Sequence, residues 1–83
     1  MKAGAVRALA ERYDVAALGA AAEAIAEGGV DPDWVEGGDP GEKLTHVMLA
    51  LRVRARMDAG EALKDAFRAE MAGVREVMTN EAE

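Results

Sequence analysis

Residues 39–58 have the sequence DPGEKLTHVMLALRVRARMD, which predicts a long helix. Asp39 is a suitable N-cap, and Pro40 suits the first helical position, where its missing N–H costs nothing. Glu42 lies three residues after Asp39, which is the spacing of a capping box. We therefore expect this helix to begin at residue 40 and to end near residue 58, a length of about 28 Å at 1.5 Å per residue.

The apolar residues of this helix fall on two sides. At 100° per residue, one side consists of Leu44, Val47, Met48, Leu51 and Ala55, and the other of Leu49, Ala50, Val53 and Met57. A helix that is apolar on both sides must be buried on both. In a chain of 83 residues, we expect one side to pack inside the subunit and Leu49, Val53 and Met57 to contact a second copy in a homodimer. The alternative is a monomer in which the other helices surround this one.

The rest of the chain predicts three more helices and no strand, so the expected fold is all-α. Their expected ranges are 3–12, 14–27 and 61–79, with a loop rich in Gly, Pro and Asp at 28–40 and a frayed tail at 80–83. Asp14 suits the N-cap of the second of these helices, and Gly60 suits the position just after a helix C-terminus. Because the connection there is short, the last two helices should form an antiparallel hairpin. We expect residues 1–83 to form a single helical domain.

The composition excludes several classes of function. With 51% hydrophobic and 31% charged residues the chain is of the globular type, and it has no Cys and no Ser to serve as a nucleophile. Its net charge of −6 is opposite to that of a nucleic-acid-binding surface. No apolar stretch reaches the roughly 20 residues that cross a membrane, and the N-terminus meets charged residues too early for a secretory signal. We therefore expect a cytoplasmic protein.

One carboxylate is expected in an apolar environment. Glu70 lies inside the apolar stripe of helix 61–79. A buried carboxylate needs a partner, and we expect Glu70 to form an ion pair with Arg54, or with Arg56, on the preceding helix. The functional alternative is a carboxylate that transfers a proton or binds a metal.

Helix 40–58 also carries a candidate metal pair. Glu42 and the only histidine, His46, lie one turn apart on the side of Leu49 and Val53. Two-fold symmetry would bring two copies of the pair together. Ferritin-like carboxylate proteins use Glu-x-x-His with a further Glu, whereas the spacing here is Glu-x-x-x-His. The structural alternative is that Glu42 caps its own helix and His46 packs or hydrogen-bonds a neighbour.

The basic residues show one concentration, which consists of Arg52, Arg54, Arg56, Arg68 and Arg75. An anion or an acidic partner could bind there. The simpler interpretation is that these arginines pair with nearby acidic residues and complement the helix dipole.

The segment VEGGDPGEKLTHVMLA, residues 35–50, resembles a family of short uncharacterised bacterial proteins through Gly-Glu-x-Leu-Thr-His at the start of the long helix. Some members of that family are encoded beside thioredoxin-like and peroxiredoxin proteins. The resemblance implies an all-helical fold, no assigned activity and an accessory role in redox or stress metabolism. Lacking Cys, this chain could not exchange thiols itself.

These observations favour a non-enzymatic accessory or adaptor protein that acts through homo-oligomerisation and contacts with an unknown protein partner. No motif predicts a cofactor, a nucleic-acid partner or a membrane partner. The alternative is a metal-binding or small catalytic protein that uses Glu42 and His46 at the subunit interface.

Overall fold

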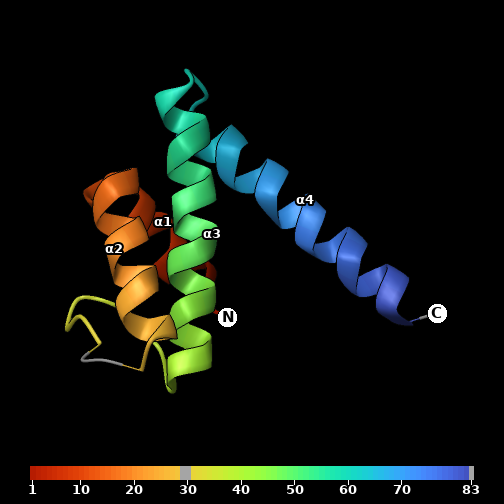
Figure 1. Ribbon diagram of the computed structural model, residues 1–83. Helices are drawn as coiled ribbons and strands as arrows, with labels where there is room; N and C mark the ends of the chain where they lie inside the picture. Colours follow the sequence, from red (N-terminus) through yellow and green to blue (C-terminus); the bar gives the residue numbers. More distant parts are fainter. Residues whose placement is uncertain (29–30, 83) are drawn as a thin grey trace.

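The computed structural model describes residues 1–28 and 31–82, with side chains as far as residue 74. The described part contains no strand and four helices: α1 (Ala3–Arg12), α2 (Val15–Ala26), α3 (Pro40–Asp58) and α4 (Leu63–Ala82) (Figure 1). The predicted all-α class is confirmed. None of these helices is both long and apolar enough to cross a membrane.

The helix starts follow the predicted caps. The Asp14 side chain accepts a hydrogen bond from the Ala17 N–H at 2.8 Å, and the Asp39 side chain accepts one from the Glu42 N–H at 2.8 Å. Both bonds satisfy an N–H group that has no partner within its own helix. The Glu42 side chain accepts from the Gly38 N–H at 2.6 Å, one residue before the cap. Local sequence is therefore sufficient to start α2 and α3.

The chain reverses after α3 at Gly60. This glycine has a φ of +112°, a conformation that side-chain-bearing residues rarely adopt. The Gly60 N–H donates to the Met57 carbonyl and the Glu61 N–H donates to the Arg56 carbonyl, each at 3.0 Å. These two bonds form a Schellman motif. The predicted end of the helix is thus confirmed.

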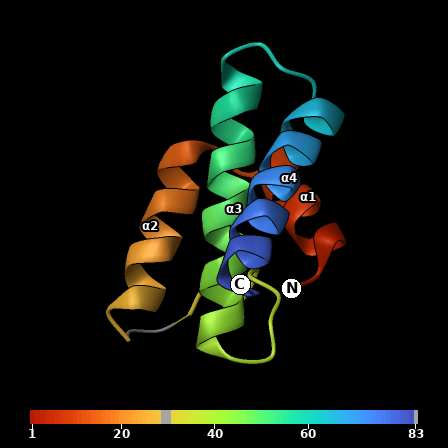
Figure 2. The same ribbon diagram turned by 90° about the vertical axis from the view of Figure 1, so that its right-hand side faces the viewer.

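Helix α3 lies at the centre of the molecule and contacts α1, α2 and α4. Figure 2 shows it between α2 on one side and α1 and α4 on the other. The fully buried apolar positions of α3 are Val47, Ala50 and Val53. They pack in one core with residues of the other elements: Val6, Leu9, Ala10, Leu18, Ala21, Ala22, Ile25, Val35 and Ala66. Small residues in α2 permit a close approach to α3, and a Cβ at Gly19 would lie 3.8 Å from Leu51.

The loop between α2 and α3 is attached to the body by apolar residues. The Trp34 ring stacks on the Tyr13 ring, with their centroids 4.0 Å apart, and Val35 is buried in the core. Lys43 in α3 forms an ion pair with Asp31 at 3.2 Å. This part of the loop is therefore held against α1 and α3.

Helix α4 diverges from α3. Figure 1 shows it leaving the end of α3 and running back at an open angle, so that its C-terminal half stands away from α1, α2 and α3. The contact is made by the first half, where Ala66 is fully buried. The closely packed hairpin that we expected is not formed along the whole length of α4. Residues 80–82, which we expected to fray, are helical.

Candidate functional site

His46 is fully buried and both of its ring nitrogens are hydrogen-bonded to the backbone. Nδ1 lies 2.6 Å from the Glu36 carbonyl oxygen, and Nε2 accepts from the Lys2 N–H at 2.9 Å. A carbonyl oxygen can only accept, so these partners place the proton on Nδ1 and make the ring neutral. The histidine therefore joins three segments: α3, the loop before it and the residue before α1.

Two ion pairs surround this ring. The Lys2 Nζ lies 3.0 Å from a Glu36 carboxylate oxygen, and the N-terminal amino group lies 3.6 Å from Glu42 Oε2. The hydrogen bond to Glu36 raises the pKa of Lys2. The hydrogen bond from the Gly38 N–H lowers the pKa of Glu42, and the nearby N-terminal amino group adds to this effect. We call Lys2, Glu36, Glu42 and His46 the His46 cluster.

The predicted metal pair lies in this cluster. Glu42 and His46 are one turn apart in α3, but a metal ion at His46 would have to replace one of its two backbone hydrogen bonds. The described part of the chain brings together no group of three or more His, Cys, Asp or Glu side chains that could hold a metal. The contacts match the structural alternative, in which Glu42 caps its own helix and His46 bonds its neighbours. Metal binding by this pair stays a prediction.

The predicted interface residues lie on a face that the subunit itself covers. Val53 is fully buried in the core, so its assignment to a subunit interface was wrong. Leu49 and Met57 are partly buried against the same core. The physical reason is that α1 and α2 both pack on α3 and together cover the side that includes Ala50 and Val53.

A different side of α3 stays open. Met48 is 47% exposed and lies on the edge of a groove of about 700 Å³ between α3 and α4. We call it the apolar groove. It is lined by Met1, Leu44, Thr45, Met48, Leu49, Arg52 and Val74. Because α4 diverges from α3, the apolar residues of this side are left without full cover.

The predicted burial of Glu70 is confirmed, and of its two predicted partners Arg56 contacts it and Arg54 does not. Glu70 is 8% exposed, and its two carboxylate oxygens accept from Arg52 Nε at 2.8 Å and from Arg56 Nε at 2.5 Å. The hydrogen bond to Glu70 raises the pKa of Arg56. Arg52 and Arg56 are one helical turn apart, so both can reach α4 from the same flank of α3.

Arg54 lies on the opposite flank of α3. Its guanidinium pairs with Asp58 at 3.1 Å and donates to the Ala10 carbonyl at 3.1 Å. The carbonyl belongs to the C-terminal end of α1, where a cation is favourable because the carbonyls there lack helical partners. Arg54 therefore fastens α1 to α3 and does not contact Glu70.

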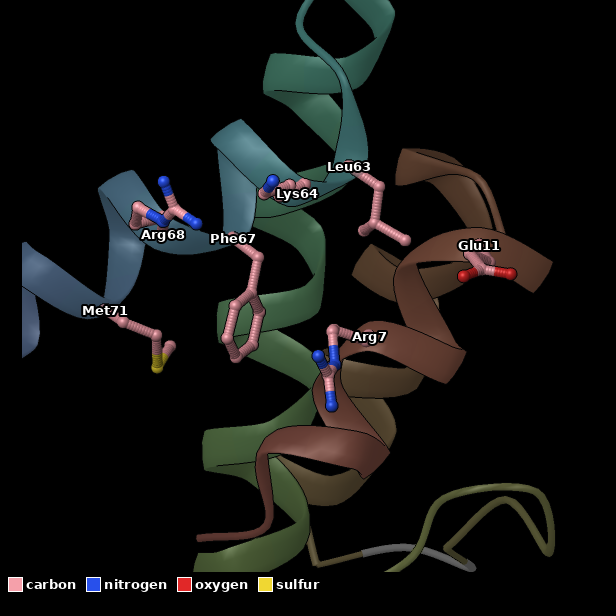
Figure 3. A pocket seen from close by; sticks show the side chains of 7 residues that line it. All are labelled: Arg7, Glu11, Leu63, Lys64, Phe67, Arg68 and Met71. Atoms are coloured by element: carbon pink, nitrogen blue, oxygen red, sulfur yellow. The ribbon is translucent and has the colours of Figure 1, made fainter.

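A second groove, of about 640 Å³, lies between α1 and the start of α4 (Figure 3). We call it the basic groove. It is lined by Arg7, Glu11, Leu63, Lys64, Phe67, Arg68 and Met71. The Arg7 guanidinium carbon lies 5.2 Å from the centroid of the Phe67 ring. Arg68 belongs to the basic concentration predicted from the sequence, but no local pattern predicts this groove, because it requires α1 to lie beside α4.

Comparison with known proteins adds one finding. A model described as "Family of unknown function (DUF6952)" matches residues 1–79. Neither a curated protein nor a solved structure matches the chain.

Proposed function

The chain belongs to this family of unknown function, and from its surface we propose that it is a non-enzymatic protein that acts through protein contacts, with the apolar groove as the contact between two copies. The observation that carries the proposal is the half-exposed Met48 in an apolar groove between α3 and α4. Exposed apolar surface of this kind is typical of interaction sites.

The charges of the groove support a second copy as its occupant. Arg52 is the one charged side chain among its lining residues, and Arg52 is already paired with Glu70 of its own subunit. The N-terminal amino group of Met1 is likewise paired with Glu42. A two-fold axis through such a surface would place against each other two grooves whose charges are already paired within each subunit. The carboxylates that would repel an equally acidic copy lie outside the groove. Methionine is also well suited to the contact because its flexible side chain fills irregular gaps.

The proposal is tested by the mass of the protein in solution. Sedimentation or light scattering at micromolar concentration should give a dimer for the unchanged chain. Met48→Glu should weaken dimerisation by at least about a hundredfold, because a carboxylate would be buried in the contact without a partner. Ala20→Glu is the matched control, since Ala20 is exposed on α2 and lies outside the groove. It should leave the dimer intact.

Two results would contradict the proposal. One is a monomer at all concentrations for the unchanged chain. The other is an equal loss of dimer in the Met48→Glu and Ala20→Glu proteins, which would mean that added negative charge, and not the groove, controls association.

We also propose a cytoplasmic accessory role in redox or stress metabolism, which rests on the family resemblance. Deletion of the gene in its own organism should increase sensitivity to peroxide, and re-expression of the unchanged chain should restore growth. Equal growth of both strains under peroxide would contradict this role.

A further inference from the structure

Three cations of the basic groove, unlike most other cations among the described residues, form no ion pair. Within residues 1–28 and 31–74, the ion pairs engage Lys2, Lys43 and the arginines of α3. None of these pairs involves Arg7, Lys64 or Arg68, although the chain has an excess of acidic residues. The lining of the groove thus has three cations and one carboxylate, Glu11. Such an excess of positive charge attracts an anion.

The same groove offers apolar contact. Leu63 and Phe67 are partly exposed, and Met71 is at the border of burial. Figure 3 shows the Phe67 ring and the Arg7 side chain close to each other, one from α4 and one from α1. The one acidic lining residue, Glu11, comes from α1 near Leu63. An occupant can therefore contact an apolar floor and a basic rim at once.

We propose that the basic groove binds a small organic anion, a carboxylate or a phosphate attached to an apolar body. The apolar body contacts Phe67 and Met71 beside Arg7 of α1, and the anionic group accepts hydrogen bonds from Lys64 and Arg68. Guanidinium groups suit both anions because their N–H groups form a planar fork. The volume of about 640 Å³ lies in the usual range of ligand sites. Such a ligand would bridge α1 and α4.

The experiment is a titration followed by the amide NMR signals of the full chain, with three probes that share one ring system. The probes are 2-naphthoate, 2-naphthyl phosphate and neutral 2-naphthalenemethanol. For ligands of about a dozen heavy atoms we expect a Kd on the order of 1 mM for the better anion. The neutral probe should bind at least about tenfold more weakly, and the ratio of the two anions identifies the preferred group.

Two variants with the same charge change locate the site. Arg68→Gln should weaken binding of the better anion about fivefold to tenfold, because one charge-assisted contact is lost. Arg12→Gln is the control, since Arg12 is an exposed cation of α1 outside this groove. It should change the Kd by less than about twofold. Both positions are exposed, so both variants should fold.

The proposal is overturned if the neutral probe binds as well as the anions, if the signals of α1 and α4 do not shift, or if Arg12→Gln weakens binding as much as Arg68→Gln. The inference is independent of dimerisation. The Met48→Glu protein should bind the anions with an unchanged Kd, because Met48 lines the other groove.

Discussion

His46 shows how one side chain can be essential to a fold without chemistry of its own. It is a polar ring at a fully buried position, and it is tolerated because both nitrogens have backbone partners, from Lys2 and Glu36. The bond to Lys2 spans 44 positions of the chain and the bond to Glu36 spans 10. The ring therefore serves as a link between segments that share no secondary structure.

Removal of this link should be destabilising. His46→Ala should lower the free energy of unfolding by roughly 2–4 kcal/mol, because it leaves a cavity and two backbone groups without a partner. Urea unfolding followed by circular dichroism measures the change. Glu23→Ala is the control: its side chain is exposed on α2 and lies outside both grooves, and its effect should stay within about 0.5 kcal/mol. Equal effects of the two substitutions would show that His46 does not link the segments.

Glu42 should make the free energy of unfolding depend on pH in the acidic range. Its pKa in the folded protein is below the ordinary value of 4.5, because the carboxylate accepts from the Gly38 N–H. The folded protein therefore binds this proton more weakly than the unfolded chain does. The stabilisation is complete above the ordinary pKa and is lost as pH falls through the lower folded-state value.

The measurement is the urea midpoint between about pH 7 and pH 3. The unchanged protein should lose more stability below pH 4.5 than Glu42→Gln does. Glu23→Gln, at an exposed position of α2, should follow the unchanged protein. Parallel curves for the unchanged protein and Glu42→Gln would contradict the assignment.

At the scale of the helices, the two flanks of α3 divide its three arginines between two neighbouring helices. Arg52 and Arg56 meet Glu70 of α4, while Arg54, on the other flank, meets the end of α1. Residues four positions apart lie on the same side of a helix and residues two positions apart do not, so Arg52 and Arg56 share one flank and Arg54 lies on the other. Two separate polar contacts therefore attach α1 and α4 to the central helix.

A pair of double-mutant cycles should reproduce this division. Glu70→Gln should lower stability by about 1–2 kcal/mol, because hydrogen bonds to charged groups are lost from a buried carboxylate. Its effect should be smaller when Arg56→Gln is already present, since the two side chains interact. With Arg54→Gln the effects should add. Thermal or urea unfolding measures all six proteins, and additivity with Arg56→Gln would show that Glu70 is held by other contacts.

The whole molecule is flat, with dimensions of 34 × 33 × 18 Å and a radius of gyration of 12.6 Å. In Figure 1 the molecule extends along α3 and, at an open angle to it, along the diverging α4. A small domain buries a low fraction of its surface, and divergence of α4 lowers this fraction further. Association is the physical means by which such a chain can bury more apolar surface.

Stability should consequently depend on protein concentration. If dimers form only from folded chains, the Tm of the unchanged protein should rise by roughly 5 °C or more between about 5 and 500 µM. The Tm of Met48→Glu should change much less over this range. Calorimetry or circular dichroism at both concentrations measures the shift, and a constant Tm for the unchanged protein would contradict linked folding and association.

Predictions from sequence succeeded where the controlling contacts are local. The caps at Asp14 and Asp39 and the turn at Gly60 depend on residues within a few positions of each other. The same is true of the apolar period that makes Glu70 a buried carboxylate. Predictions failed for Val53 and for Arg54 as the partner of Glu70, whereas the alternative partner Arg56 was correct. Each depends on which neighbour covers which side of α3.

The amino-acid sequence alone was thus sufficient for the all-α class, the helix starts and the two apolar sides of α3, since hydrogen bonds and helical periodicity act over one or two turns. Only the tertiary structure determined that His46 is bonded on both nitrogens, that α4 diverges and that the basic groove brings Arg7 to Phe67. The reason is that these features depend on the angles at which helices pack. Those angles result from the sum of many weak contacts between segments far apart in the chain.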